Sequence, residues 1–245
     1  MCDVSTPAPS PLPRRLLAEL LGTCLLVAVV VGSGIAAQTL SPDDVGLQLL
    51  ENSMATVFGL TVLILWLGPV SGAHFNPVVS LADWFLGRRT RAGLSLPEVG
   101  AYAVAQATGG IAGAVLANVM FEVDLALSTK DRLGSGHLVA EVVATAGLVA
   151  IIFALARTGR GLLAAPVVGA WIGAAYWFTS STSFANPAVT LGRVFTDTFA
   201  GIAPGSAPAF VGMQVVGLVV GIALTLALYP DAGEHADDVV VPHSR

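Results

Sequence analysis

Six apolar stretches in this sequence are each close to the roughly 20 residues that an α-helix needs to cross a bilayer. Hydropathy places them near residues 16–37, 46–67, 98–121, 138–156, 162–180 and 208–229. Two further apolar segments, 76–86 and 186–195, are too short to cross alone. Charged residues make up only 11% of the chain, against roughly 25% in soluble domains, so little of it can face water. The sequence therefore predicts an all-α membrane protein embedded in the lipid bilayer.

Basic residues are unevenly distributed between the predicted loops. Seven of the eleven Lys and Arg residues fall on one side of the membrane: Arg14, Arg15, Arg88, Arg89, Arg91, Arg157 and Arg160. The positive-inside rule places this side, and both termini, in the cytoplasm. We expect a multi-pass protein of the plasma (inner) membrane, with a cytoplasmic head at 1–13 and a cytoplasmic tail at 231–245. The net charge of -5 and the scattered basic residues exclude nucleic acid as a partner.

The two halves of the chain repeat each other. Three matched features appear in the same order: 18–23 with 140–145, 76–81 with 186–191, and Gln106, Gly109 and Gly113 with Gln214, Gly217 and Gly221. Each half contains three spans, so the second half must enter the membrane from the opposite face. We therefore expect two inverted repeats, at 14–125 and 126–230, with small residues four apart allowing close helix contacts.

Each repeat carries an Asn-Pro pair inside its short apolar segment, Asn76-Pro77 and Asn186-Pro187. Asn is a favoured N-cap and Pro is favoured at the first helical position, so each pair predicts the start of a short helix. Irregular backbone in front of it survives at membrane depth only where it lines water or is buried in protein. Two such half-helices would meet N-terminus to N-terminus, with the Asn oxygens capping the helices and the amide NH2 groups pointing into a pore. This arrangement passes neutral molecules and rejects protons and cations; the alternative is two capped helices that conduct nothing.

A resemblance to a known family rests on Glu19 and Thr23, the loop Ser71-Gly72-Ala73-His74-Phe75-Asn76-Pro77, Glu141 and Thr145, and Asn186-Pro187-Ala188. On these residues the chain, over about 14–230, is identified as a member of the major intrinsic protein family, the aquaporins and aquaglyceroporins. The resemblance implies a right-handed bundle of six tilted transmembrane helices and two re-entrant half-helices in inverted repeats. It also implies one pore per subunit and a homotetramer.

The chain departs from the family pattern at two positions beside the Asn-Pro pairs. Val78 stands where the family usually has Ala, and Val189 stands where it nearly always has the Arg that narrows the outer filter. Spacing from the motifs carries the other filter positions over to Thr56, Ala174 and Ser183. A small shift in register would instead bring in one of three nearby aromatic residues, Phe58, Tyr176 or Trp177. A filter of Thr, Ala, Ser and Val would be wider and less polar than a water-only filter.

This filter resembles that of bacterial channels that lack the filter Arg and are linked to arsenic resistance. We expect a passive channel for small neutral solutes: water, glycerol-like polyols and metalloid hydroxides such as uncharged arsenite. There are three alternatives: a water-selective aquaporin, an ion-coupled secondary transporter and a non-conducting interaction protein. The transporter could also use inverted repeats and broken helices. No nucleophile-and-base pair, phosphate loop or metal-ligand cluster is present, so we expect neither an enzyme nor a cofactor.

Four polar residues around the motifs have two readings each. Glu19 and Glu141 lie in apolar spans, where they could carry protons or, as the resemblance implies, accept hydrogen bonds from the loops before each Asn-Pro pair. His74 could gate the cytoplasmic mouth by titrating, or could be a neutral packing residue. Arg193, four residues beyond Val189 and so on the same helix face, could supply a charge to the outer vestibule or be an ordinary paired or solvated residue.

Overall fold

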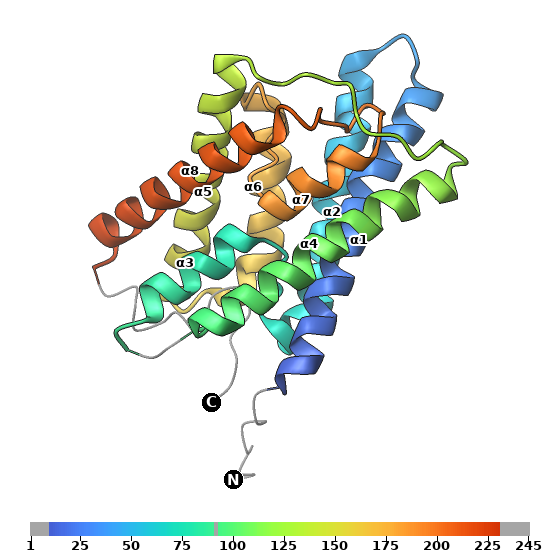
Figure 1. Ribbon diagram of the computed structural model, residues 1–245. Coiled ribbons are helices and arrows are strands. Elements are labelled where there is room, and N and C mark those ends of the chain that lie inside the picture. The colour runs from blue at the N-terminus through green and yellow to red at the C-terminus, as the bar shows by residue number, and fades with distance from the viewer. Residues whose placement is uncertain (1–9, 91–92, 231–245) are drawn as a thin grey trace.

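The computed structural model describes residues 10–90 and 93–230, which form helices and loops and no strand (Figure 1). The long helices are α1 (Leu12–Leu40), α2 (Val45–Ser71), α4 (Leu96–Met120), α5 (Ser135–Arg157), α6 (Ala164–Phe178) and α8 (Ala207–Leu228). With the 3-10 turn η1 (Gly161–Leu163) in front of α6, all six are long and apolar enough to span a membrane. The predicted all-α membrane fold is confirmed. The predicted tail at 231–245 and the first nine residues of the head lie outside the described residues.

Polar residues cap two of the long helices, which begin one or two residues before the predicted apolar stretches. Asp44 precedes α2, and its Oδ1 accepts a hydrogen bond from the Leu47 backbone N–H at 2.9 Å. At the start of α4, Glu98 Oε2 accepts from the Ser95 backbone N–H at 2.8 Å. Such caps satisfy the free N–H groups of a first turn. Hydropathy alone does not register such caps, and the helix ends differ from the predicted spans by one to four residues: α1, α2 and α5 are longer than predicted, and α6 is shorter.

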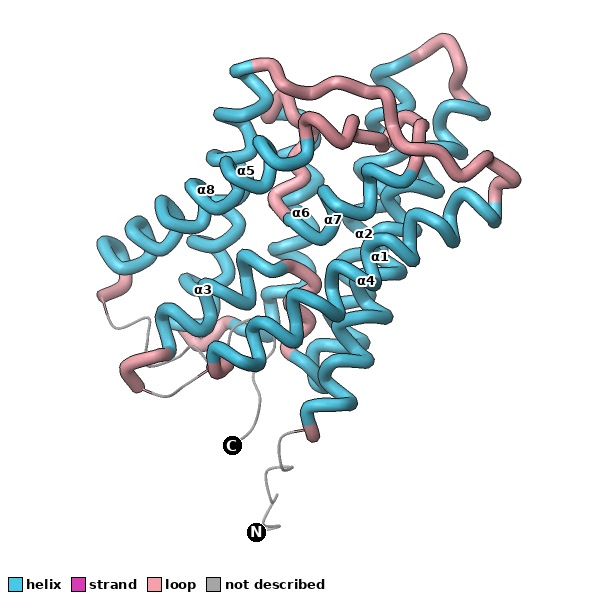
Figure 2. The backbone as a smooth tube through the Cα atoms, in the orientation of Figure 1, coloured by secondary structure: helices cyan, strands magenta, loops and turns pink. Residues whose placement is uncertain are grey.

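Two short helices, α3 (Pro77–Gly87) and α7 (Pro187–Gly192), begin inside the bundle, and the 3-10 turn η2 (Arg193–Phe195) continues α7. Figure 2 shows an irregular segment running into the bundle before each of them. These segments and helices correspond to the re-entrant loops and half-helices that the paired Asn-Pro motifs predict. The two half-helices contact each other, and α7 also packs against α4 of the opposite repeat.

Glycine residues bring the long helices of each repeat close together. In the first repeat, a Cβ atom on Gly109 or Gly113 of α4 would collide with the α1 backbone carbonyls of Leu20 and Cys24. In the second repeat, a Cβ on Gly217 would lie 2.8 Å from a backbone carbonyl of α5. The same pairing, α1 with α4 and α5 with α8, thus recurs in both halves. The close approach predicted from small residues four apart is present.

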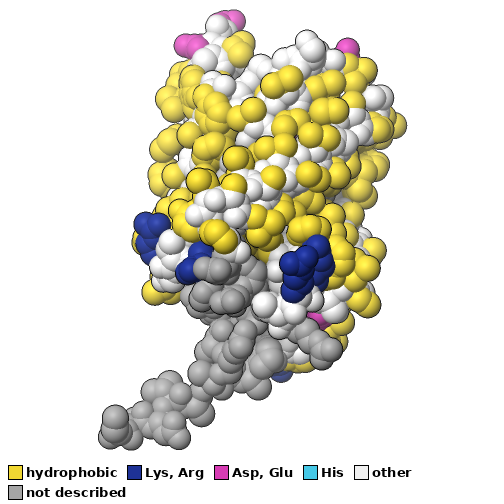
Figure 3. All heavy atoms as spheres, turned by 90° about the vertical axis from the view of Figure 1, so that its left-hand side faces the viewer, with side chains coloured by type: hydrophobic (Ala, Val, Ile, Leu, Met, Phe, Trp, Pro, Cys, Tyr) yellow, Lys and Arg dark blue, Asp and Glu magenta, His cyan; other side chains and the backbone are white. Residues whose placement is uncertain are grey.

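The outer surface has the distribution of side chains expected for a bilayer protein. Large apolar side chains are exposed on several helices, among them Phe58, Trp66, Val104 and Leu162. Figure 3 shows a band of hydrophobic side chains between Lys and Arg residues near the termini and acidic residues at the other end of this face. Lipid tails can cover such a band without leaving charges in the hydrocarbon region.

Candidate functional site

Each half-helix is capped by the Asn of its Asn-Pro pair. Asn76 Oδ1 accepts a hydrogen bond from the Val78 backbone N–H at 3.1 Å, and Pro77 occupies the first turn. Asn186 Oδ1 accepts from the N–H of Ala188 at 2.9 Å and of Val189 at 3.3 Å, with Pro187 again in the first turn. Backbone N–H groups that would be unsatisfied inside the membrane therefore have partners, as the motif predicts.

The amide NH2 groups of the two Asn residues also link the repeats. Asn76 Nδ2 donates to the Ala185 carbonyl at 2.8 Å, and Asn186 Nδ2 donates to the Phe75 carbonyl at 2.7 Å. The prediction that both NH2 groups point wholly into a pore is thus corrected. Each NH2 has two hydrogens, so one N–H of each Asn remains for a solute. The correction follows from burial, because each carbonyl would otherwise be an unpaired acceptor in the interior.

The loops in front of the half-helices have an unusual backbone. Ala73 and Phe75 before α3 have φ angles of 50° and 49°, and Ser183 and Ala185 before α7 have φ angles of 51° and 49°. Side chains other than Gly seldom adopt this left-handed region, and each such residue costs on the order of 1 kcal/mol or more. Because the residue between each of these pairs does not share the positive φ, successive backbone carbonyls point in different directions. Strong external hydrogen bonds must hold such loops in place.

Glu19 of α1 supplies those hydrogen bonds in the first repeat. Its carboxylate is fully buried and accepts from the backbone N–H groups of His74 at 3.0 Å and Phe75 at 2.7 Å. It also accepts from Ser71 Oγ at 2.7 Å and Gln106 Nε2 at 2.7 Å. With four donors, this carboxylate has no free position on which a transported proton would reside.

Glu141 of α5 repeats the arrangement in the second half. It accepts from the N–H groups of Phe184 and Ala185, both at 2.9 Å, and from Ser181 Oγ and Gln214 Nε2, both at 2.6 Å. The two buried glutamates therefore support the re-entrant loops in matching ways. This geometry favours the supporting role over the proton-carrying alternative.

One interior cavity extends past both Asn side chains. Its lining residues include Leu26, Val30, Leu60, Ile64, His74, Asn76, Val79, Leu148, Ile152, Ile172, Asn186 and Arg193. The centre of a water molecule can reach about 60 Å³ of it, several times the roughly 15 Å³ that one water requires. Most of the wall is apolar, and its polar groups come from the two loops, from α2 and α6, and from Arg193. This is the candidate pore.

Three of the four predicted filter residues lie on this cavity, and one does not. Thr56, Ser183 and Val189 line it, whereas Ala174 is exposed on the outside of α6. Tyr176 lines the cavity instead. Two positions along a helix turn about 200° around its axis, so Ala174 and Tyr176 face opposite sides. Spacing counted back from Asn186 selects the wrong face of α6, and the shifted register restores an aromatic residue.

The hydroxyl groups of Thr56 and Tyr176 form a pair 3.1 Å apart. Because Thr56 Oγ1 already donates to the Asn52 carbonyl at 2.8 Å, the Tyr176 hydroxyl is the donor of this pair. The Tyr176 oxygen can then accept a hydrogen bond from a solute. Nearby, Ser183 Oγ is buried, and within the described residues it has no hydrogen-bond partner. A solute hydroxyl would satisfy it.

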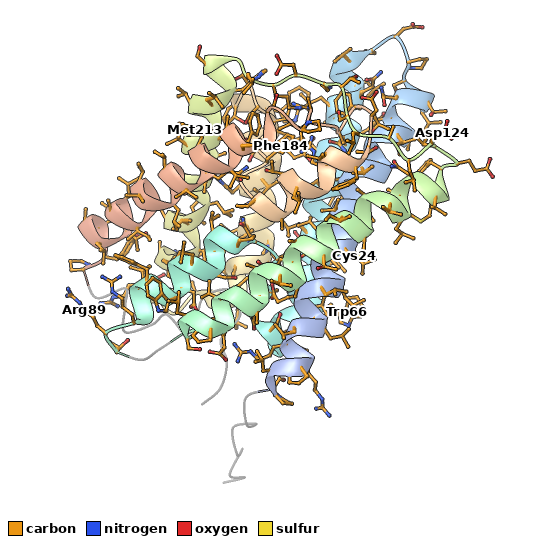
Figure 4. All side chains as sticks on the ribbon, viewed as in Figure 1. Cys24, Trp66, Arg89, Asp124, Phe184 and Met213 are labelled. Carbon is orange, nitrogen blue, oxygen red and sulfur yellow. The ribbon has the colours of Figure 1, made fainter. Side chains whose placement is uncertain are left out.

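Arg193 lies at the end of α7 with its side chain only 2% exposed, and it lines the same cavity. Its Nε donates to the Ala200 carbonyl, and its guanidinium carbon lies 3.4 Å from the centre of the Phe184 ring. Figure 4 shows Phe184 in the half of the bundle remote from the termini. Over residues 10–90 and 93–230, no carboxylate lies within 4 Å of the guanidinium. Arg193 is therefore neither a solvated residue nor an ordinary ion pair.

His74 lies on the cavity at the other side of the Asn pair. Its Nδ1 is 3.0 Å from Ser80 Oγ, and its ring centre is 5.5 Å from that of Tyr102 in an edge-to-face arrangement. The side chain is 8% exposed, so it is packed from several sides. These contacts fit a packing role for His74.

Sequence reasoning missed Arg132, which belongs to the loop at 121–134. Its side chain is 6% exposed, its Nε donates to the Gly201 carbonyl at 2.9 Å, and its guanidinium carbon lies 5.0 Å from the centre of the Phe184 ring. One signal for it exists in the sequence. Lys130 and Arg132 are basic residues on the side of the membrane where the positive-inside rule disfavours them.

These features define a membrane channel: six spanning helices, two half-helices that meet inside the bundle, and a cavity passing their capping Asn residues. A comparison with family models matches residues 8–183 to the major intrinsic protein family. Aquaglyceroporin AqpS of Rhizobium meliloti is 52% identical over 215 residues, which cover 87% of this chain and 89% of that protein. The glycerol uptake facilitator protein of Pseudomonas aeruginosa is 31% identical, over 82% of this chain and 80% of that protein.

The fold itself has a solved counterpart. The X-ray structure of the aquaglyceroporin from Plasmodium falciparum matches with a TM-score of 0.62 at 20% identity, covering 91% of this chain and 99% of that one. The chain belongs to the major intrinsic protein family. It is a channel for small neutral solutes.

Proposed function

We propose that this channel conducts small polyols, water and uncharged metalloid hydroxides down their concentration gradients. The observation that carries the proposal is the single cavity lined by Asn76, Asn186 and Arg193. Relatives named as an aquaglyceroporin and a glycerol uptake facilitator support a polyol among its solutes.

The centre of the cavity favours neutral solutes over cations. The N-termini of α3 and α7 and the remaining N–H groups of Asn76 and Asn186 direct positive charge toward a passing molecule. A hydroxyl or water oxygen can accept hydrogen bonds from both amides, whereas a cation loses hydration and meets a repulsive field. A water whose oxygen accepts both bonds points its hydrogens away from the centre, which interrupts proton transfer along a water chain.

The outer end combines polar groups with an apolar wall. Arg193 and the Ser183 hydroxyl can donate to a solute, the Tyr176 oxygen can accept from it, and Val189 with Ile172 provides the apolar side. A polyol has hydroxyl groups along one edge and C–H groups along the other, so it matches such a lining. We propose these residues, with Thr56 and without Ala174, as the selectivity filter.

Arsenite at neutral pH is the uncharged triol As(OH)3, with a size and a hydroxyl pattern similar to those of glycerol. A filter that accepts a small triol by its hydroxyl groups offers little discrimination against it. We therefore include arsenite among the proposed solutes. Water passes the same cavity because it is smaller than either.

We also propose an orientation in the membrane and an oligomeric state for the channel. The basic residues near the termini support cytoplasmic ends in the plasma (inner) membrane, with 14–125 and 126–230 as the two repeats. We propose a homotetramer with a separate pore in each subunit. The exposed apolar faces of the long helices provide surfaces for lipid and for neighbouring subunits.

The test is stopped-flow light scattering on proteoliposomes containing the full chain. After an osmotic shock with glycerol or arsenite, the vesicles should reswell faster than protein-free vesicles prepared in the same way. Counterflow measurements with an imposed proton or sodium gradient should show no uphill accumulation, since no free carboxylate lines the described cavity. Glycerol reswelling at the rate of empty vesicles would contradict the proposal, and normal glycerol entry without arsenite entry would remove the metalloid part.

A further inference from the structure

Three cations converge at the outer end of the cavity, on three consecutive backbone carbonyls. Lys130 Nζ donates to the Phe199 carbonyl at 2.9 Å, Arg193 Nε donates to the Ala200 carbonyl, and Arg132 Nε donates to the Gly201 carbonyl at 2.9 Å. Two of them, Arg132 and Arg193, also stack on the Phe184 ring. We refer to Lys130, Arg132 and Arg193 as the outer cation cluster.

The outer cation cluster has no anionic partner in the part of the chain that the structure describes. Among residues 10–90 and 93–230, no carboxylate lies within 4 Å of any of its three charged groups. The two neighbouring aspartates are engaged elsewhere: Asp131 accepts from Ser206 Oγ at 2.7 Å, and Asp197 accepts from the Thr129 backbone N–H at 2.9 Å. Partial burial of the Lys130 ammonium group, together with the charges of Arg132 and Arg193, lowers the pKa of Lys130 to about 8. The cluster therefore keeps a net positive charge, because Glu141, which attracts Arg132 and Arg193 without contacting them, offsets at most one of the three cations.

The cluster is reachable from the outer solution and from the cavity. The Lys130 residue is exposed, and Arg193 lines the cavity. The two terminal nitrogens of Arg193 have no hydrogen-bond acceptor among the described residues. Ser183 Oγ, on the same cavity and in a residue only 3% exposed, also has no partner. A buried hydroxyl and a guanidinium with unused donors are independent indications of a missing ligand.

We propose that the outer cation cluster is a binding site for a small monovalent oxyanion, such as a carboxylate or a sulfonate. Two oxygens on one centre match the parallel N–H groups of a guanidinium, and a third donor is available from Ser183. The rings of Phe184 and Phe199 exclude water around the cations, which strengthens their attraction for an anion. Small size is required because the site lies at the entrance of a narrow cavity.

The consequence concerns transport and rests on the proposed channel function. A bound oxyanion occupies the donors that a polyol needs at the outer end of the cavity. External oxyanions should therefore slow the entry of neutral solutes without crossing the membrane themselves. The slowing should saturate with concentration and weaken at high ionic strength, since an exposed lysine contributes to the site.

The experiment measures glycerol entry into proteoliposomes of neutral phosphatidylcholine with sodium methanesulfonate outside. Sodium gluconate at equal ionic strength and osmolality is the reference, because its six-carbon hydroxylated chain makes it much larger than the small oxyanions that we propose. Methanesulfonate stays ionised, so it cannot cross as a neutral acid. We expect glycerol entry to be at least twofold slower at 100 mM methanesulfonate, because a weak site with a Kd of about 100 mM or below is at least half filled at this concentration. A parallel set of vesicles with phosphatidylglycerol distinguishes a lipid phosphate from a free anion: a lipid occupant slows entry without any added anion.

Two variants locate the site, and one serves as a control. Arg132→Gln should weaken the methanesulfonate effect about tenfold, as expected for a lost charge-assisted hydrogen bond. Lys130→Gln, at a more exposed position, should weaken it about threefold. Arg89→Gln removes an exposed cation at the opposite end of the molecule, labelled in Figure 4, and should change nothing. Each variant is compared with its own rate in gluconate.

A second measurement does not depend on transport. Methanesulfonate should raise the Tm of the detergent-solubilised native protein relative to gluconate, and should raise that of Arg132→Gln less, because a ligand of the native state stabilises it. Normal glycerol entry in gluconate with no slowing and no Tm shift in methanesulfonate would overturn the anion site while leaving the channel intact. Slowing that is equal in Arg132→Gln and the native chain would also overturn it, as would slowing by phosphatidylglycerol alone. Absent glycerol entry in every buffer, with a Tm shift present, would contradict the channel function and not the site.

Discussion

Replacing Arg193 by Met tests whether this residue supplies the positive charge that the filter otherwise lacks. Met has a similar length and is apolar, so the side chain can still pack on Phe184 while the charge disappears. A cation that passes about 5 Å from a guanidinium is repelled by roughly 3 kcal/mol at an effective dielectric constant of about 20. Removal of that barrier corresponds to about a hundredfold faster cation passage at this point.

The variant also affects stability, which the experiment must separate from conduction. The Ala200 carbonyl loses its partner, and an unsatisfied buried acceptor costs about 1 to 3 kcal/mol. Relief of the repulsion between Arg193 and the other two cations of the cluster offsets part of this loss. We therefore expect a small decrease in Tm and a folded channel.

The assay uses proteoliposomes loaded with a pH-sensitive dye and a potassium gradient clamped by valinomycin. Arg193→Met should raise the proton leak, while glycerol entry should stay within about threefold of the native rate because Ser183 and Tyr176 remain. Arg89→Met is the matched control, since Arg89 is exposed and far from the cavity. An unchanged leak in Arg193→Met, with glycerol entry and Tm near native, would refute the assigned role. The barrier at Asn76 and Asn186 remains in this variant, so it limits how far the proton leak can rise.

Three further changes test other parts of the structure. Val189→Arg adds a second guanidinium one helical turn from Arg193, about 6 Å away, and should slow glycerol entry far more than water entry; equal slowing of both would contradict the proposed filter. Glu141→Gln removes acceptor capacity from four donors, so it should reduce the free energy of unfolding by about 2 kcal/mol or more, and should lower both the Tm and the rate of glycerol entry. A native Tm would contradict the supporting role. Gly113→Ala places a Cβ against the α1 backbone and should lower the Tm of the solubilised protein, whereas Gly212→Ala, with open space around it, should not; equal Tm values would contradict the close packing of α1 and α4.

The parts of the site that sequence reasoning predicted are those that appear twice in the chain. Glu19 and Glu141, and the two Asn-Pro pairs, occupy equivalent positions of an inverted repeat, so each supports the interpretation of the other. Their roles depend on local geometry: each Asn caps the half-helix that follows it, and each Glu accepts hydrogen bonds from the loop in front of the half-helix in its own repeat. The hydrogen bonds of the two glutamates correspond bond for bond, whereas Asn186 Oδ1 accepts from one backbone N–H more than Asn76 Oδ1 does.

The parts that sequence reasoning missed break the repeat. Tyr176 reaches the cavity because of where α6 begins after the turn η1, and a shift of two residues reverses the face that a helix presents. Arg132 lies in an irregular loop whose path depends on contacts with residues 199–206, about 70 positions later. Neither the register of α6 nor the path of this loop is indicated by a periodic pattern in the sequence. Hydropathy also cannot show that an apolar residue such as Ala174 faces outward, because both faces of α6 are apolar.

In the proposed filter, the position of Arg193 accounts for a cation although position 189 is not Arg. One turn of helix separates the two positions, so Arg193 projects from the same face of α7, nearer to the outside. Its guanidinium is held by the Ala200 carbonyl and the Phe184 ring, and the Phe184 backbone is fixed in turn by its hydrogen bond to Glu141. Val189 then leaves an apolar surface directly beside the Asn pair. We propose that this charge, placed outside the narrow centre, repels cations before they lose hydration, and that the apolar surface behind it leaves room for solutes larger than water.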